Sequence, residues 1–189
     1  MILGILSDTH GQRRRTVDAL RVLRAAGAAA LVHCGDVGDE GVLEELAGWQ
    51  AWVVWGNCDR AHPGLAACAE SFGLQTTRVA PLVIRLDGRT LAVFHGHEPA
   101  FARVELLLQT PAAARLGEPL RDCDYILCGH AHAPRDERIG GVRLINPGAL
   151  HRVRVPTVAT LDLRSDTLGF WHVYDGPGET APVRYQVER

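Results

Sequence analysis

The chain contains no lysine: all 20 of its basic residues are arginine, and 22 aspartate and glutamate residues balance them among 189 in total. The formal net charge is −2 at pH 7, so the overall charge gives no reason to expect nucleic acid or an anionic membrane as the partner. With so many alanine, glycine and proline residues, the lack of lysine indicates a bias of genome composition rather than a chemical function.

Paired cysteine motifs and long apolar runs are missing. The five cysteines form no C-x-x-C pair and their number is odd, so we expect no disulfide framework and a cytoplasmic location. No apolar stretch approaches the ~20 residues of a membrane-spanning helix. The opening MILGIL runs directly into polar SDTHG, which predicts a first strand rather than a secretion signal.

Repeats, linkers and low-complexity segments are also missing, so residues 1–189 are predicted to form a single domain. In the first half, apolar runs typical of buried strands alternate with amphipathic segments typical of helices. The expected strands are 1–7, 28–34 and 51–56, and the expected helices are 13–27 and 40–49. This order predicts a parallel sheet whose loops after the strands meet at one edge.

The second half is predicted to be richer in antiparallel strands. Two hairpin patterns are expected, over 81–95 with a type I′ turn at Asp87-Gly88 and over 135–146 with a turn at Gly140-Gly141. The remaining expected elements are a helix over 98–117 with a break at Pro111, strands over 123–128, within 156–174 and over 183–187, and a loop over 175–182.

Residues of metal-ligand type gather directly after apolar runs at five places. The stretches are SDTHG with Asp8 and His10, HCGDVG with His33 and Asp36, WGNCDR with Asn57 and Asp59, FHGHE with His95 and His97, and CGHAHAP with His130 and His132. In an extended chain, side chains two residues apart point to the same side. Each Asp-x-His or His-x-His pair is therefore expected to aim two ligands into one pocket, and adjoining glycines allow close approach of the backbone.

Each stretch alone has an ordinary explanation. An isolated His-x-His pair is more often a solvated loop or a satisfied buried pair than a ligand pair, and an isolated Gly-Asp is usually a turn. All five together, each after an apolar run, favour a metal site. The mixed oxygen and nitrogen ligands, without clustered cysteine, differ from those of a closed structural zinc site. Seven ligand-type residues suit two metal ions that share one carboxylate.

The ordered motifs SDTHG, CGD, GNCD, HGH and GHAH resemble those of the calcineurin-like metallophosphoesterase superfamily. The short chain and its Asn146-Pro147-Gly148 most resemble the small bacterial and archaeal phosphodiesterase branch, which is related to the retromer subunit of the same fold. The resemblance implies an α/β fold of two packed mixed β-sheets flanked by helices, an αββα sandwich. It also implies a dinuclear metal site at the C-terminal edges of the strands.

The resemblance also implies how the ligands divide between the two divalent ions. The set for one ion is Asp8, His10 and His132; the set for the other is Asn57, His95 and His130; and Asp36 bridges the two. Mn²⁺ is the expected metal, with Fe²⁺, Ni²⁺ or Zn²⁺ as alternatives. Two carboxylates against two divalent ions leave about two positive charges, which favour a phosphate oxyanion and lower the pKa of bound water.

The expected function is a hydrolase, a metal-dependent phosphodiesterase that cleaves small phosphodiesters by attack of a metal-bridging hydroxide. The alternatives are a phosphomonoesterase and a catalytically weak scaffold of the same fold. A nuclease for long nucleic acid is not expected, because no extra domain or basic groove is visible. A metallopeptidase is not expected either, because H-E-x-x-H is missing. A homo-oligomer is left open.

Three further residues are candidates for catalysis. Cys58 stands where many superfamily members have a histidine, and its alternatives are an inert thiol, a weak proton donor and a nucleophile. Asp59 is expected to orient a neighbour or cap the following turn. His97 is the candidate to contact phosphate, as Asn57 is, or to donate a proton; its alternative is a hydrogen bond that supports a ligand.

Several other polar residues have expected roles outside the ligand set. His33 is expected to support the site, and Asn146 to hold the nearby loop. The arginines at 13–15 could contact phosphate, although a solvated helix face is favoured. Surface or core roles are the default for His62, His151 and His172. The segment 98–120 is predicted to act as a partial lid or to mediate a dimer, and the sequence does not separate these.

Overall fold

The computed structural model describes residues 1–62, 64–109, 117, 120–174 and 182–187. The larger of its two sheets contains seven strands in the order β12-β11-β10-β1-β2-β3-β4. Their bounds are β1 Ile2–Leu6, β2 Ala30–His33, β3 Ala51–Val53, β4 Gln75–Thr76, β10 Thr157–Asp162, β11 Thr167–His172 and β12 Arg184–Tyr185. Strands β1 to β4 are parallel to one another, whereas β10 to β12 are added in antiparallel fashion beside β1.

The smaller sheet contains five strands in the order β5-β6-β7-β9-β8. Their bounds are β5 Leu82–Leu86, β6 Arg89–Val93, β7 Tyr125–Leu127, β8 Pro134–Ile139 and β9 Val142–Pro147. Strands β6, β7 and β9 are parallel, and β5 and β8 pair in antiparallel fashion at the two edges. Each sheet therefore has a parallel block whose strand ends can carry site residues.

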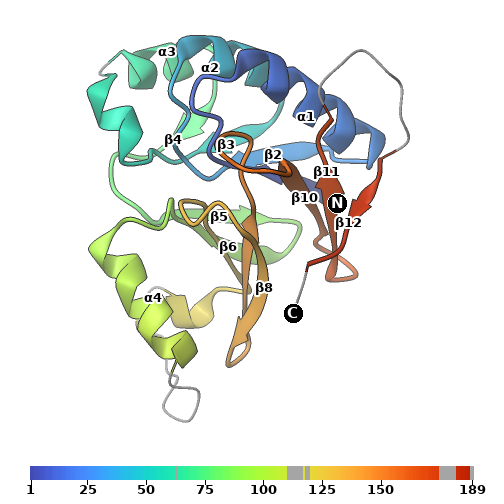
Figure 1. Cartoon of the computed structure of the whole chain (residues 1–189). Coiled ribbons are helices and arrows are strands. Elements are labelled where there is room, and N and C mark those ends of the chain that lie inside the picture. The colour runs from blue at the N-terminus through green and yellow to red at the C-terminus, as the bar shows by residue number, and fades with distance from the viewer. Residues whose placement is uncertain (63, 110–116, 118–119, 175–181, 188–189) are drawn as a thin grey trace.

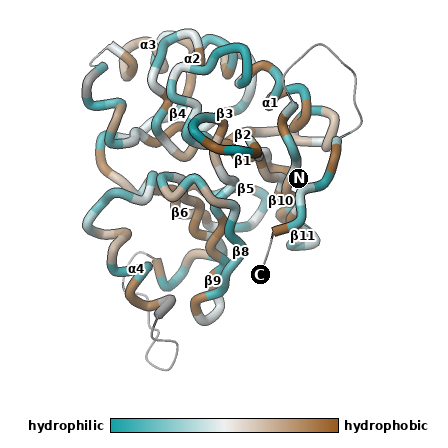
Figure 2. Tube along the Cα trace, viewed as in Figure 1, coloured by the Kyte–Doolittle hydropathy of each residue, from teal (hydrophilic) through white to brown (hydrophobic). Residues whose placement is uncertain are grey.

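Buried side chains of the strands point alternately to the two faces of each sheet, and this divides the hydrophobic core into layers. In β1, Leu3 and Ile5 pack between the sheets with β6 and β7, whereas Leu6 lies on the outer face beneath the helices. In β7, Leu127 points into the layer between the sheets and Ile126 faces outwards. The apolar residues that Figure 2 shows along these strands thus serve three packed layers.

Helices cover the outer face of each sheet. Figure 1 shows α1 (Arg13–Ala25), α2 (Glu40–Leu46) and α3 (Leu65–Ser71) together over the larger sheet and α4 (Pro99–Gln109) beside the smaller one. Short 3-10 helices lie at Cys58–Ala61 and Leu120–Asp122. The predicted sandwich of two mixed sheets flanked by helices is confirmed.

Most of the expected elements lie where the sequence predicts them. Asp87 and Gly88 both have positive φ, 50° and 78°, as a type I′ turn requires. The elements α3 and β4, and the short helix at Cys58–Ala61, were not predicted. The expected break at Pro111 and residues 175–181 of the expected loop over 175–182 lie outside the described residues.

Within the described ranges, every helix is too short or too polar to cross a bilayer.

Candidate metal centre

Loops after strands of both sheets meet at one place. Asp8 follows β1, Asp36 follows β2 and Asn57 follows β3 in the larger sheet. In the smaller sheet, His95 follows β6, and His130 with His132 follows β7. Backbone hydrogen bonds join the loops: Asp8 N–H donates to the Gly35 oxygen at 3.0 Å and Gly129 N–H to the His95 oxygen at 2.7 Å.

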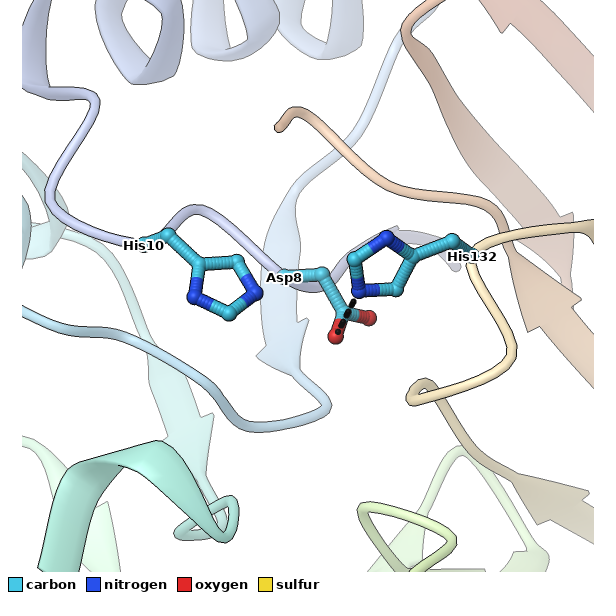
Figure 3. A group of neighbouring side chains, drawn as sticks. All are labelled: Asp8, His10 and His132. Carbon is cyan, nitrogen blue, oxygen red and sulfur yellow. Dashed lines mark ion pairs between the residues drawn. The ribbon is translucent and has the colours of Figure 1, made fainter. Parts of the chain in front are cut away.

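Asp8 lies between two imidazoles. Figure 3 shows His10, Asp8 and His132 together, and the Nε2 atom of His132 lies 3.1 Å from Oδ1 of Asp8. One ligand-type atom from each of these three residues lies within 4.8 Å of the others. The other carboxylate oxygen of Asp8 accepts the backbone N–H of His130 at 3.0 Å, which joins the two sheets at the site.

Asp36 lies between histidines from different sheets. Its Oδ2 atom is 3.4 Å from Nε2 of His10 and 3.4 Å from Nε2 of His95. Burial alone would raise the pKa of Asp36, but its contact with His95 and the backbone N–H of Cys58 hold it well below its ordinary value. The carboxylate is therefore ionised, and its position between the two histidines suits a bridging ligand.

His130 and Asn57 lie at the exposed rim of the cluster. The ring centroid of His130 is 5.1 Å from that of the buried His95. The side-chain amide of Asn57 donates to Sγ of Cys58 at 3.5 Å. That thiol lies with the ligand atoms of His10 and Asp36 in a group within 4.8 Å, so Cys58 faces the cluster.

Four buried side-chain atoms here form no hydrogen bond with any described residue. They are Asp8 Oδ1, His10 Nε2, His95 Nε2 and His97 Nδ1. Buried polar atoms are nearly always hydrogen-bonded, and each exception calls for a partner of another kind. Three of the four belong to the groups of mutually close ligand atoms. Carboxylate oxygen and imidazole nitrogen atoms that lie this close together without hydrogen bonds fit the ligands of divalent cations.

The backbone that presents these side chains is not extended. Asp8, His10, Asp36, His130 and His132 all have positive φ, between 44° and 64°. Non-glycine residues rarely adopt this conformation, and such strain concentrates at functional sites. The pairs Asp8 with His10 and His130 with His132 therefore converge through left-handed turns, and the expected alternation of an extended chain is not the reason for their convergence.

Two glycines permit the loops to approach this closely. A Cβ atom on Gly56 would lie 1.9 Å from Oδ1 of Asp36, and one on Gly129 would lie 2.0 Å from Oγ of Ser7. Neither distance is possible for a real side chain. The glycines of the GNCD and GHAH motifs thus make room for the ligands of neighbouring loops.

Asp59 joins two of the ligand-bearing loops. Its carboxylate is buried and accepts the backbone N–H of Gly38 at 2.8 Å and that of Gly56 at 2.7 Å. The side chain thus holds the loop after β2 against the loop after β3. These contacts give Asp59 an orienting role, and any effect on turnover would reach the substrate through the loops that it joins.

His33 and Asn146 support the cluster from behind. The backbone N–H of Gly35 donates to Nδ1 of His33 at 3.1 Å, so the proton of this imidazole is on Nε2, which donates to Thr9 Oγ1 at 3.0 Å. Asn146 donates to the Gly129 oxygen at 2.7 Å and accepts the N–H of Gly148 at 2.9 Å. Both residues lie where the sequence predicts supporting roles.

His97 is paired with an arginine that the sequence reasoning missed. Nη2 of Arg60 lies 3.3 Å from Nε2 of His97. Because a guanidinium only donates, Nε2 accepts and the imidazole is neutral. Burial, which outweighs the opposing charge of Glu98, lowers the pKa of His97, and the nearby His95 and Arg60 lower it further. The exposed Arg60 therefore carries the positive charge on this side of the site.

His151 also lies beside the cluster, although the sequence suggested no role there. Its ring centroid is 5.3 Å from that of His10, in the connection between β9 and β10. The next residue, Arg152, has positive φ of 55°. By contrast, Arg13 pairs with Glu44 and Glu45 at 2.9 and 2.8 Å, on the helix surface.

Comparisons with known proteins identify the superfamily of the chain. The calcineurin-like phosphoesterase superfamily domain matches residues 1–166. The probable metallophosphoesterase YsnB of Bacillus subtilis is 30% identical over 168 residues, which cover 86% of this chain and 84% of that protein. A phosphodiesterase of Methanocaldococcus jannaschii is 23% identical over 166 residues, which cover 86% of this chain and 93% of that protein.

Solved structures show the same fold. An archaeal phosphodiesterase superposes with a TM-score of 0.74 at 21% identity, covering 91% of this chain and 99% of that one. Vps29 of Entamoeba histolytica, in complex with Zn²⁺, superposes with a TM-score of 0.58 at 16% identity, covering 97% and 99%. With the superfamily domain matching most of its length, the chain belongs to the calcineurin-like phosphoesterase superfamily.

Proposed function

We propose that the protein is a metal-dependent phosphodiesterase acting on small phosphodiesters. The proposed ligands of one divalent ion are Asp8, His10 and His132, those of the other are Asn57, His95 and His130, and Asp36 is shared. Mn²⁺ is the metal we expect, because the ligands mix carboxylate, amide and imidazole.

One observation carries the proposal. Asp8, His10 and His95 each place a buried polar atom in the cluster without any hydrogen bond to the described residues. Such atoms would cost several kcal/mol between them if nothing else were bound, at about 1–3 kcal/mol per group. Divalent cations satisfy all three at once, and the left-handed turns that present Asp8 and His10 are explained by the same requirement.

Divalent ions held by these residues would supply positive charge for the phosphate oxygens and lower the pKa of water enough to provide a nucleophile near neutral pH. The chain contributes the rest. The amide of Asn57, in place of a third carboxylate, preserves the net positive charge. Arg60 adds a guanidinium beside His97, where it can bind a phosphate oxygen.

The Cys58 thiol supports a diester rather than an alkyl monoester as substrate. Burial raises the pKa of Cys58, and the contact with Asp36 raises it further, so the thiol is protonated at neutral pH. A neutral thiol is a weaker proton donor than an imidazolium at this position. Departure of an alkoxide is therefore poorly assisted, and substrates with better leaving groups are favoured.

A reducing, cytoplasmic location forms part of the proposal. All five cysteines are free thiols, and Cys34, Cys123 and Cys128 are buried. Cytosolic proteins typically keep their cysteines in this state.

The test is turnover of bis-p-nitrophenyl phosphate and of p-nitrophenyl phosphate by metal-stripped protein, with single metals added back. We expect Mn²⁺ to stimulate hydrolysis of the diester more than of the monoester. Asp36→Ala should lower the diester rate at least about 100-fold, because it would remove a carboxylate that we propose as a ligand of both ions. Unchanged turnover in Asp36→Ala would remove the bridging role. If no metal stimulates either reaction, a scaffold of the same fold is the better description.

A further inference from the structure

A cavity of about 580 Å³ lies directly beside the candidate metal centre. Its volume falls in the range of pockets that bind small molecules, ~300–1,000 Å³. Gly56, Asp59 and His97 form its inner wall. Gly56 touches the Asp36 carboxylate, since a Cβ atom at this glycine would lie only 1.9 Å from Oδ1 of Asp36, and His97 is two residues from His95. The cavity therefore begins where the phosphate is expected to bind.

The outer walls of this cavity are largely apolar. They come from the end of β3, from α3, from the loop before β5 and from the start of α4, and include Trp55, Leu65, Val79 and Ala100. The Val79 side chain is 76% exposed, although valine is ordinarily buried. An exposed apolar side chain on a concave surface, close to polar groups that can fix orientation, is typical of a ligand pocket.

The acids and the arginines that line the cavity differ in their partners. The two acids in its lining are occupied by backbone groups: Asp59 binds the N–H of Gly38 and Gly56, and Glu98 binds those of His95 and Gly96. The lining also contains Arg60 and Arg78. Within the described parts of the chain, neither arginine forms an ion pair with a carboxylate. An anionic group that carries an apolar body matches this arrangement.

We infer that the cavity receives one organic arm of the phosphodiester and selects substrates in which that arm is bulky and aromatic. The inference rests on the proposed function, because it takes the phosphate to lie at the metal ligands. Arg60 lines the cavity and lies 3.3 Å from His97, so it would bind a phosphate oxygen while the arm packs against Val79 and Ala100. Small arms such as methyl would leave these apolar walls in water.

The test measures binding, so that it does not depend on turnover. Dissociation constants of 1-naphthyl phosphate and methyl phosphate, two product-like monoesters, are measured by titration calorimetry in the presence of Mn²⁺. We expect the naphthyl ester to bind roughly tenfold or more tightly, since apolar pockets discriminate by about this factor. Ala100→Trp should fill the cavity and remove this preference, while methyl phosphate binds as before.

Ala102→Trp is the matched control. Ala102 is also exposed on α4, but two residues correspond to about 200° around a helix, and Ala102 does not line the cavity. It should keep the preference for the naphthyl ester. Val79→Asp is a second test variant that leaves the core intact, since Val79 is exposed, and it should also weaken binding of the naphthyl ester by at least about fivefold relative to methyl phosphate.

The outcomes separate the two proposals. Equal affinity for both esters in the wild-type protein, failure of both to bind, or an equal loss of the preference in Ala100→Trp and Ala102→Trp would overturn the inference. A preference that is lost only in the cavity variants supports it, even if bis-p-nitrophenyl phosphate is not hydrolysed with any metal. That last result would count against the proposed function alone.

Discussion

Cys58 differs from its neighbours in the cluster, because its thiol points at ligand atoms of His10 and Asp36 yet is protonated at neutral pH. A protonated thiol is neither a good nucleophile nor a strong anionic ligand. The Cys58→Ser variant should therefore retain at least about half of the metal-dependent diesterase rate, since serine keeps the size and the weak polarity of the side chain. The measurement is the initial rate with bis-p-nitrophenyl phosphate at saturating Mn²⁺.

Alkylation provides the control for this prediction. Iodoacetamide should react slowly at Cys58 at pH 7, because only the thiolate attacks. If Cys58→Ser loses all activity while its thermal stability is unchanged, the thiol has a chemical role that the structure does not explain.

His33 predicts a pH dependence of stability. Burial, together with the nearby His95 and His10, lowers the pKa of its imidazole to about 3, against the opposing charge of Asp36. In the unfolded chain the value is ~6.5, so between these values the unfolded state binds more protons. Stability is therefore fully present above pH ~6.5 and is lost as the pH falls towards 3, by up to ~1.4 kcal/mol per pH unit.

The measurement compares metal-free wild-type protein with His33→Gln by urea unfolding at pH 6.5 and pH 5. The wild type should lose about 2 kcal/mol more of its unfolding free energy than the variant over this interval. Protonation of the other histidines affects both proteins, so the difference reports on His33. Parallel loss in both would show that His33 is not neutral in the folded protein.

At the scale of elements, the site depends on how closely the loop after β3 approaches the loop after β2. The Gly56→Ala substitution would place its Cβ 1.9 Å from Oδ1 of Asp36. We expect metal affinity to fall roughly 10- to 100-fold, as for other changes that displace a ligand without removing it. Isothermal titration with Mn²⁺ measures this directly.

Gly141→Ala is the matched control, because no atom lies within 4 Å of its added Cβ and its φ is not positive. It should bind Mn²⁺ as the wild type does. Equal affinity for Mn²⁺ in Gly56→Ala and Gly141→Ala would mean that the Asp36 carboxylate can move without weakening metal binding.

Elements were predictable where their apolar pattern was long. The sequence of α1 predicts a helix because Leu20 and Leu23 are apolar at helical spacing, and both are buried. The hairpin is predicted by the turn residues Asp87-Gly88 between two apolar runs. By contrast, α3 has seven residues with only Leu65 and Ala69 buried, which is too short for a period to emerge. Strand β4 has two residues and is defined only by its pairing with β3.

At the scale of the whole molecule, the proposed ions would join the two sheets. Asp8, His10 and Asp36 follow strands of the larger sheet, whereas His95 and His132 follow strands of the smaller one. Metal binding to the folded state alone stabilises it by ~2.7 kcal/mol at 100 times the dissociation constant. For a chain of this length we expect the midpoint of thermal unfolding to rise by about 5–10 °C.

Thermal unfolding followed by circular dichroism, with and without Mn²⁺, tests this prediction. The shift should disappear in Asp36→Ala, because that residue contacts histidines from both sheets. A shift that is equal in the wild type and the variant would place the metal elsewhere on the protein.

Residue types and their spacing along the chain specified which chemical groups were available and that they would lie at the ends of strands. Apolar runs ended in Asp8, Asp36, Asn57, His95 and His130, and parallel strands present such ends at a common edge. This local information is carried by residue type and spacing, and it sufficed for the fold class and the superfamily.

How these groups meet, and what surrounds them, depends on the packing of segments that are far apart in the sequence. The left-handed turns at Asp8 and His10, the pairing of Arg60 with His97 and the position of His151 beside His10 all depend on contacts between distant segments. The cavity lined by Val79 and Ala100 likewise exists only because the start of α4 packs opposite the loop before β5. Such contacts depend on how the two sheets pack against each other. Local patterns in the sequence do not predict that packing.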